Sequence, residues 1–473
     1  MFGNGLPIRT NILSAPHPNW GHLQDMLSLP NIPVEVWRHI FVQIIRIPGL
    51  LLTDRTDPFS PVREADLFCD RDLRTRVAML LVCKGWHGMI SELIHEHVHL
   101  TSVCQVDIMA SRFERSKLYD GRRHLGTHTR RIDVSIHNPT PKVMTNLARI
   151  LRCTPNLEIF TNSNSYTTLS VGSQYISPPF CTSSDVIQAI LSTSASSLRR
   201  LEWTCNECPS WDDLMLLLRA LHGLCSLTLA NIYGSYPERI KREYLILPNL
   251  RTLILGDSPS FSHASLGNVP LNTLLTMLSD SSDQLPCLQR LEGFSPFSPT
   301  FLSTHGYKIR IIRTVAYTPL LPDIIAKCTN LETFITIFPH QFLDQLTHSS
   351  LRRIGIFPIS EDVVGVPAQI FNAYIMKPLE DLMCQIEQSD LPSLAHVRLR
   401  NVGTLAGVVN YPVFIRKWQD RWRSRDVRFD DKGGQSFDAD ALGKLQLYNM
   451  INANRSQPVD ADERSAIDSQ GHR

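Results

Sequence analysis

The chain has 473 residues, of which 43% are hydrophobic, so it is long enough for two or more domains and too apolar for an intrinsically disordered protein. Its 47 basic and 45 acidic side chains give a formal net charge of +2, and this balance creates no general attraction for nucleic acid or an anionic membrane. The sequence predicts no membrane span and no signal peptide. Its 11 cysteines follow no disulfide spacing, which indicates reduced thiols in an intracellular protein, cytoplasmic or nuclear.

The N-terminal region predicts a tail followed by a helix. Residues 1–28 are rich in Pro, Asn, Gly and Ser and predict a disordered tail. Pro33 suits a first helical turn, and apolar residues then recur at helical spacing as far as Ile45. Residues 46–71 are polar and contain prolines, so we expect a long loop there.

Two more helices and a strand are expected after this loop. Helical spacing of apolar residues recurs from about Asp72 to Leu81 and from Trp86 to Ile94, and residues 97–100 then alternate as in a strand. Three short helices with one apolar face each are not stable separately. We therefore predict one helical module over residues 29–100, with the loop 46–71 inserted into it.

Residues 101–450 repeat a short pattern that is typical of leucine-rich repeats. Residues 224–229 (LCSLTL) and 250–255 (LRTLIL) match L-x-x-L-x-L. Looser copies begin at Leu157, Leu198, Leu288, Leu331, Leu351 and Leu394, and residues 309–312 are a further degenerate candidate. Each copy is expected to form a short strand.

Segments with helical spacing lie between these strands, for example residues 143–151, 186–191, 214–221, 271–278 and 368–386. Strand and helix in alternation predict a parallel sheet. One such unit cannot cover its own apolar side, so the units should stack into an α/β solenoid with strands on the concave face and helices on the convex face. An ordinary α/β domain with leucine-rich strands is the alternative. The concave positions show no repeated aromatic or acidic ladder.

The end of the chain predicts a cap and a second tail. Residues 416–425 form a basic segment with tryptophan and helical spacing, and residues 427–429 are a candidate closing strand. A terminal repeat is expected to be atypical, because it covers the end of the stack. Residues 451–473 are polar and predict disorder.

Two motifs in the helical module resemble the F-box. Residues 32–41 (IPVEVWRHIF) are similar to its opening pattern L-P-x-E-L-L-x-x-I-F, and residues 82–86 (VCKGW) are similar to its closing pattern V-C-K-x-W. Together with the array that follows, they resemble fungal F-box proteins with leucine-rich repeats. Such a resemblance implies docking on a Skp-type adaptor of a cullin–RING ubiquitin ligase, with the second domain holding a protein substrate.

The implied role is that of a non-catalytic substrate adaptor in a Skp–cullin–F-box (SCF) E3 ubiquitin ligase. Ubiquitin transfer belongs to other subunits, so this chain would contribute proximity and orientation and would need no cofactor or metal. The positions that match the motif, and that would contact or frame the adaptor, are Pro33, Val36, Trp37, Ile40, Val82 and Trp86.

Two alternatives remain open beside this role. Residues 46–71 are longer than an ordinary F-box connection of roughly ten residues. They could pack outside the module or block the adaptor, and in the second case the chain would be a leucine-rich scaffold without a ligase role. Trp37, Ile40 and Trp86 could also form the core of the module itself, since an apolar helix stripe is usually core.

A formal zinc-protease motif gives a further alternative of low weight. His95-Glu96-x-x-His99 matches H-E-x-x-H, whose chemistry needs both histidines on one face of a helix. Here the motif falls where a helix should end and a strand begin, which argues against a zinc hydrolase.

Two other features are weaker still. Cys205 and Cys208 form a single C-x-x-C pair without the second pair that a structural zinc site needs. Basic residues also gather between Arg112 and Arg131, where we expect a solvated loop or a contact with an acidic substrate rather than a nucleic-acid site.

Overall fold

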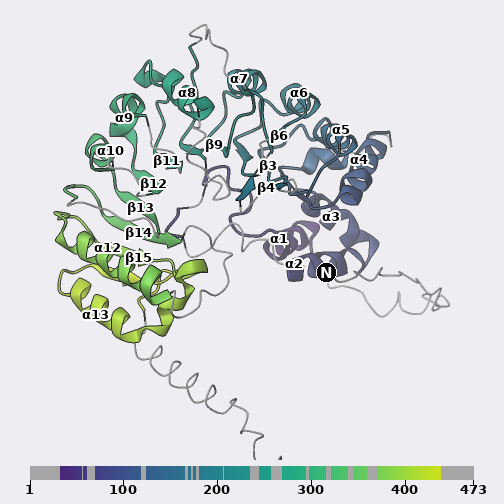
Figure 1. Cartoon of the computed structure of the whole chain (residues 1–473). Coiled ribbons are helices and arrows are strands. Elements are labelled where there is room, and N and C mark those ends of the chain that lie inside the picture. The colour runs from purple at the N-terminus through teal and green to yellow at the C-terminus, as the bar shows by residue number, and fades with distance from the viewer. Residues whose placement is uncertain are drawn as a thin grey trace, which may run out of the picture.

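The computed structural model describes residues 32–55, 57–60, 70–118, 124–165, 169–171, 174–176, 180–205, 207–234, 244–256, 269–293, 298–315, 321–338, 346–358 and 371–437. Over these residues the chain is a mixed α/β protein, curved into an arc with strands inside and helices outside (Figure 1). The predicted tails, residues 1–28 and 451–473, lie outside the described residues.

One parallel sheet follows the inside of the arc. Twelve strands pair in the order β1-β2-β3-β7-β9-β10-β11-β12-β13-β14-β15-β16, so each of them lies beside the next of the twelve along the chain. These strands are β1 (His97–Leu100), β2 (Arg131–Val134), β3 (Ile159–Asn162), β7 (Arg200–Trp203), β9 (Ser226–Leu229), β10 (Thr252–Leu255), β11 (Arg290–Gly293), β12 (Ile311–Val315), β13 (Thr333–Phe338), β14 (Arg353–Pro358), β15 (His396–Leu399) and β16 (Arg428–Asp430). The predicted parallel sheet is confirmed.

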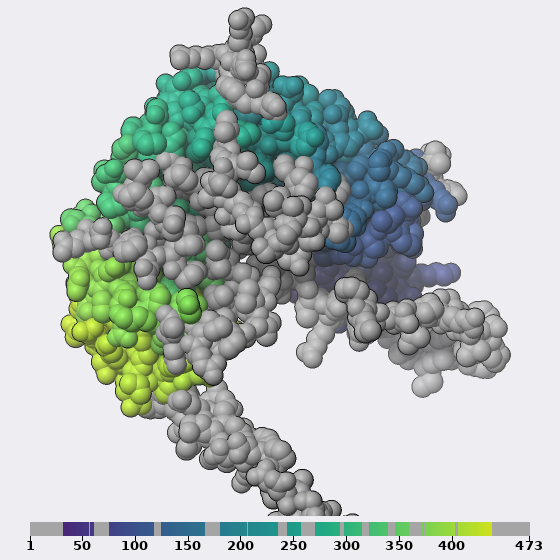
Figure 2. Space-filling model, viewed as in Figure 1, coloured from purple at the N-terminus to yellow at the C-terminus, as the bar shows by residue number. Residues whose placement is uncertain are grey.

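Helices lie on the outer side of the arc and connect most of the strands (Figure 1), and the space-filling view shows the arc from the same side (Figure 2). Several of these helices pack on the helix of the next unit, most closely where α5 lies between α4 and α6. The helices are α4 (Val103–Leu118), α5 (Pro141–Leu151), α6 (Ser184–Thr193), α7 (Trp211–Ala220), α8 (Val269–Met277), α9 (Pro299–His305), α10 (Leu321–Lys327), α12 (Lys377–Gln388) and α13 (Pro412–Arg423).

The alternation of strand residues places the main core between the sheet and these helices. In β9, Leu227 and Leu229 are buried in that core, whereas Ser226 and Thr228 alternate with them and face the inside of the arc. The same alternation holds along the other strands, because the leucine pattern repeats in register. The regular leucines thus fix the side of the sheet that the helices cover.

The three helices predicted within residues 29–100 are present and lie next to β1. They are α1 (Val34–Ile45), α2 (Asp70–Leu80) and α3 (Lys84–Ile94). Pro33 precedes α1, and the thiol of Cys83 accepts a hydrogen bond from the Trp86 backbone N–H at the start of α3. Both α1 and α2 pack on α3, so α3 is the centre of the module.

Three details differ from the sequence expectations. The basic stretch from Arg112 to Arg131 was expected to be a loop, but its first part lies on α4, where Arg149 of α5 pairs with Glu114. Strand β2 was not predicted, because its sequence RIDV contains no leucine. Finally, the predicted helix 368–386 is described as a short π-helix, η7 (Asn372–Met376), followed by α12.

The last unit closes the stack as the sequence suggests. Trp418 and Trp422 of α13 are fully buried, and their rings lie 5.9 Å apart. They cover the core beside β16, which is the last strand of the sheet. Among the described helices, none has both the length and the apolarity of a membrane span.

Candidate functional site

The six predicted adaptor-contacting residues divide into an exposed and a half-buried group. Pro33, Val36 and Val82 are exposed, with 46% of Val36 and 56% of Val82 accessible to solvent. Trp37, Ile40 and Trp86 are half-buried. The two motif halves therefore each contribute an exposed apolar side chain and at least one side chain that faces the module.

The half-buried tryptophans belong to an aromatic core. The Trp86 ring lies 5.2 Å from the Trp37 ring and 4.7 Å from the Phe41 ring, measured between centroids. Phe41 and Ile90 are fully buried in the same cluster. The interpretation of Trp37 and Trp86 as core residues is thus supported, although neither ring is completely covered.

Further apolar side chains of the module are exposed. Ile44 (53% accessible) continues the α1 stripe that contains Val36 and Ile40. Leu81 (79%) lies directly before Val82, after the end of α2. Sequence spacing placed Ile44 and Leu81 on the apolar stripes of their helices, but both side chains are exposed. Exposed apolar residues along one helix face, as Val36 and Ile44 are on α1, are typical of a binding surface.

A second candidate surface is the inner face of the sheet, where two rows of side chains run from strand to strand. The basic row contains His97, Arg131, Ile159, Arg200, Ser226, Thr252, Arg290, Ile311, Thr333, Arg353, His396 and Arg428. The carboxylate row contains His99, Asp133, Thr161, Glu202, Thr228, Ile254, Glu292, Arg313, Ile335, Gly355, Arg398 and Asp430.

As the sequence predicts, no aromatic or acidic ladder runs along the described strands of this face, because the acids of the carboxylate row lie on strands that are not neighbours; a recurring arginine–acid pair is present instead. Four strands carry arginine in the basic row and an acid two residues later in the carboxylate row: Arg131-x-Asp133, Arg200-x-Glu202, Arg290-x-Glu292 and Arg428-x-Asp430. Residues two apart on a strand point to the same side, so each pair can form an ion pair within one strand. The signal was present in the sequence as a recurring R-x-[D/E], which a search for leucines alone overlooks.

Neighbouring cations lower the pKa of two buried carboxylates of this face, Glu292 and Asp133. Burial alone would raise the pKa of Glu292, but the guanidinium groups of Arg290 and Arg313 outweigh it and hold the pKa at about 2. His97 and Arg131 likewise hold the pKa of Asp133 at about 2 against the effect of burial. Both acids therefore carry a negative charge at neutral pH.

The loop inserted between α1 and α2 lies on these two rows. Its residues 50–55 and 57–60, here called the crossing segment, pass along the inside of the arc from β2 to β15. The side chain of Arg131 donates a hydrogen bond to the carbonyl of Leu50, and that of Arg398 donates one to the carbonyl of Phe59. In its described part, then, the insertion contacts the surface on which the sequence predicted a substrate.

Charged side chains of the crossing segment pair with both rows. Arg55 Nε lies 2.9 Å from Glu202 Oε1, and Arg353 Nη1 lies 2.6 Å from Asp57 Oδ2. These two contacts join residues that are 147 and 296 positions apart in the chain. Arg55 and Arg200 outweigh the effect of burial and hold the pKa of Glu202 well below its usual range.

Phe59 is the apolar contact of the crossing segment. Only 8% of its side chain is exposed, and it packs against Ile335 and Phe357 in a small cluster separate from the main core. The guanidinium carbons of Arg398 and Arg353 lie 4.8 and 5.1 Å from the centre of its ring. Cation–π attraction therefore adds to the burial of an apolar ring at this position.

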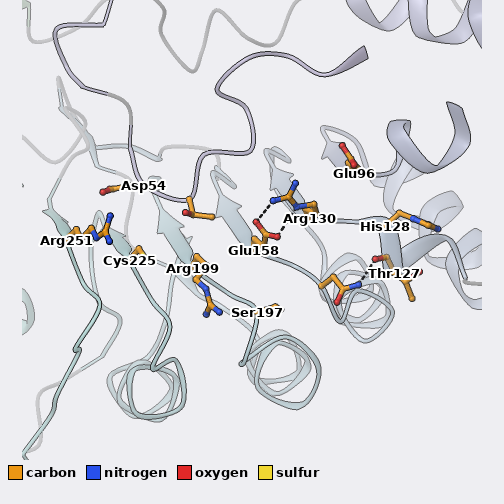
Figure 3. A pocket seen from close by; sticks show the side chains of 12 residues that line it. Asp54, Glu96, Thr127, His128, Arg130, Glu158, Ser197, Arg199, Cys225 and Arg251 are labelled. Atoms are coloured by element: carbon orange, nitrogen blue, oxygen red, sulfur yellow. Dashed lines mark hydrogen bonds and ion pairs between the residues drawn. The ribbon is translucent and has the colours of Figure 1, made fainter. Parts of the chain in front are cut away.

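A cavity of about 720 Å³ opens at the edge where the first strands begin (Figure 3). Arg130 donates two hydrogen bonds to Glu158 there, at 2.7 and 2.8 Å. Three carboxylates and three arginines line the cavity, so their charges balance and give no preference for an anion. They are Asp54, Glu96 and Glu158, with Arg130, Arg199 and Arg251.

The zinc-protease motif does not have the geometry of a zinc site. His95 follows the last residue of α3 and its Nδ1 lies 2.6 Å from the Ser91 carbonyl, whereas His99 lies in β1 with its Nε2 3.2 Å from Ser135 Oγ. The two histidines therefore do not share a helix face. In the described parts of the chain, His, Cys, Asp and Glu form no group of three that could hold a metal ion.

The other weak motifs also lack site geometry. Cys208 is fully buried, and burial raises the pKa of its thiol far above the usual range, which opposes formation of a metal-binding thiolate. Cys205 is half-buried, and burial raises its pKa as well. Of the basic cluster, Arg130 pairs with Glu158 and Arg131 with Asp133, while residues 119–123 are outside the described part.

Comparison with known proteins adds no family to these observations: the chain matches no protein-family model and no curated protein sequence.

Proposed function

We propose that the chain is a substrate-recognition adaptor of an SCF-type E3 ubiquitin ligase. In this proposal the helical module is an F-box that docks on a Skp-type adaptor. The arc is a leucine-rich-repeat solenoid that holds a protein substrate. The chain itself is not catalytic, and its contribution is to bring the substrate close to the ubiquitin-transferring subunits.

One observation carries the proposal: Val36 and Val82, one from each half of the F-box-like motif, are both exposed while the aromatic residues between them form a core. A helical module that served only its own packing would gain nothing from two exposed valines at these motif positions. A partner that covers them would remove apolar surface from water, at roughly 25 cal/mol per Å².

The course of the insertion is also compatible with docking. Its described part contacts the inner face of the sheet through Leu50, Arg55 and Phe59, and Val36 and Val82 remain exposed. Of the two expectations for the loop 46–71, packing away from the docking residues is the one that these contacts favour. A leucine-rich scaffold without a ligase role is the competing function, and it differs from the proposal in a single property, adaptor binding.

The proposal is tested with the double variant Val36→Asp/Val82→Asp. Both side chains are exposed, so the variant should remain folded but should lose at least about tenfold in affinity for a Skp-type adaptor, because a charge would be desolvated in the interface. Val413→Asp is the matched control, since Val413 is 82% exposed on α13, at the other end of the arc. Equal adaptor binding by both variants would contradict the assignment of these residues.

A further inference from the structure

We infer that the inner face of the sheet is a peptide-binding site, and that the crossing segment occupies it as an internal ligand. The partner that fits is a protein segment with an arginine, an aspartate two residues later and a phenylalanine two residues after that. This site depends on the proposed role of the solenoid as the substrate-binding part, but not on adaptor docking.

The chemistry of the partner follows from the contacts of three alternate residues. Arg55 lies at Glu202 of β7 with 19% of its side chain exposed, Asp57 binds a guanidinium of β14, and Phe59 is enclosed by side chains of β13 and β14. A cation, an anion and an aromatic ring are thus each met by a complementary group of the sheet. The three positions define the pattern R-x-D-x-F.

The inner face also holds the backbone of the crossing segment. Arginine side chains of β2, β7 and β15 donate hydrogen bonds to the carbonyls of Leu50, Leu52 and Phe59. These hydrogen bonds go to backbone carbonyls, so they do not depend on which side chains the bound segment carries. They would hold any chain that runs along the arc, whereas Arg55, Asp57 and Phe59 supply selectivity.

Three buried arginines of the face have carboxylate partners on the sheet itself, whereas Arg353, 27% exposed, pairs with Asp57 of the crossing segment. Arg131 and Arg200 each lie 2.8 Å from a carboxylate of their own strand, and Arg290 is paired with Glu292 in the same way. Release of the crossing segment would therefore leave these buried arginines paired, which avoids the large cost of a lone buried charge. A face whose buried arginines stay paired without its internal ligand can exchange that ligand for another that replaces Asp57 at Arg353 and Phe59 at its apolar contact.

Covalent attachment makes the internal ligand a strong competitor. A segment tethered by short connections acts at an effective concentration in the millimolar range. A free peptide of the same sequence should therefore bind the natural chain weakly, and it should bind well once the tethered segment has lost its main contacts. Substrate would have to displace the crossing segment.

The test uses the full chain and a fluorescent peptide with the sequence of residues 50–60, titrated by fluorescence anisotropy. The variant Arg55→Ala/Phe59→Ala should bind this peptide at least about tenfold more tightly than the natural chain. A second peptide, with glutamate in place of its arginine and alanine in place of its phenylalanine, should bind the variant at least about tenfold more weakly than the first.

Leu52→Ala is the control within the crossing segment, because Leu52 is 49% exposed and contributes its backbone carbonyl, which alanine retains. It should bind the peptide no better than the natural chain. Phe59→Ala alone, which keeps Arg55 at Glu202, should still give several-fold tighter binding if the double variant does not fold. A folded variant that binds no peptide, or a natural chain that binds it equally well, would overturn the inference.

No adaptor is present in this titration, so the result is independent of docking. A chain carrying Val36→Asp/Val82→Asp in addition to Arg55→Ala/Phe59→Ala should bind the peptide as tightly as the chain with the second pair alone. Loss of adaptor binding with retained peptide binding would separate a failure of the proposed docking from a failure of the peptide site.

Discussion

Arg55 and Glu202 form an ion pair of 2.9 Å between the inserted loop and strand β7, and the Glu202 side chain is only 3% exposed. Arg200 binds the same carboxylate from within the strand at 2.8 Å. Two guanidinium groups, one local and one from a distant part of the chain, therefore share one buried acid. This contact joins the helical module to the arc.

Replacing Arg55 with alanine should lower the free energy of unfolding by about 1–3 kcal/mol, because a charged hydrogen bond to a buried group is lost while Arg200 still neutralises Glu202. Chemical unfolding followed by circular dichroism measures this change. Arg38→Ala removes a surface pair, with Arg38 61% exposed, and should change the free energy of unfolding by less than about 1 kcal/mol. Equal effects of the two changes would show that the Arg55 contact does not stabilise the fold.

Stability should decrease in acid because of the carboxylate row. The pKa of Glu292 in the folded chain is about 2, below its ordinary value of 4.5, so the unfolded chain takes up a proton first as the pH falls. The stabilisation is complete above pH 4.5 and is lost between 4.5 and about 2.

Glu292→Gln removes this titration. The variant should be less stable at neutral pH, and its free energy of unfolding should fall less steeply across the acid window than that of the natural chain. Urea unfolding at several pH values measures both slopes. Identical slopes would mean that Glu292 does not carry the depressed pKa.

Gly126 allows the backbone before β2 to approach closely the backbone that follows α5. A Cβ atom at this position would lie 2.1 Å from the carbonyl oxygen of Cys153, so the backbone would have to shift. Gly126→Ala should therefore cost about 1–3 kcal/mol of stability, as overpacking does. Gly88→Ala is the matched change in α3, where a Cβ would meet nothing within 4 Å, and it should stabilise the chain by up to about 1 kcal/mol. Thermal unfolding of the two variants tests whether Gly126→Ala lowers the melting temperature and Gly88→Ala raises it.

The purified chain should bind no stoichiometric zinc at His95 and His99. One histidine ends a helix and the other lies in a strand, so they do not converge on one ion. Elemental analysis of the natural chain and of the His95→Ala variant measures the zinc bound per chain. One equivalent of zinc per chain that disappears in the variant would restore the hydrolase alternative.

The regular part of the fold was predictable because the L-x-x-L-x-L pattern indicates both where a strand lies and which of its sides is buried. The leucines of residues 224–229 and 250–255 face the helices. Their spacing therefore predicted both the position of β9 and β10 and the side of each strand that is buried. The closing helix and strand were predicted from spacing within residues 416–425 and 427–429, and they are present as α13 and β16. Strand β2 was missed because Ile132 and Val134 replace the leucines of the pattern.

The candidate sites were less predictable, for two different reasons. The paired rows of the inner face were encoded locally, as arginine with an acid two residues later, and a search for this pair at each strand would have found them. The position of the inserted loop was not encoded locally. Arg398 and Phe59 are 339 residues apart, and their contact exists only once the arc has formed. No spacing in the sequence reports such a contact.

The most direct test of the proposed function is a titration of the purified full chain with a purified Skp-type adaptor, by isothermal calorimetry. We expect saturable binding with one adaptor per chain and a dissociation constant of about 1 µM or tighter, equivalent to about 8 kcal/mol. We also expect that Val36→Asp/Val82→Asp abolishes this binding while Val413→Asp preserves it. A folded natural chain that shows no binding at micromolar concentrations would contradict the ligase role.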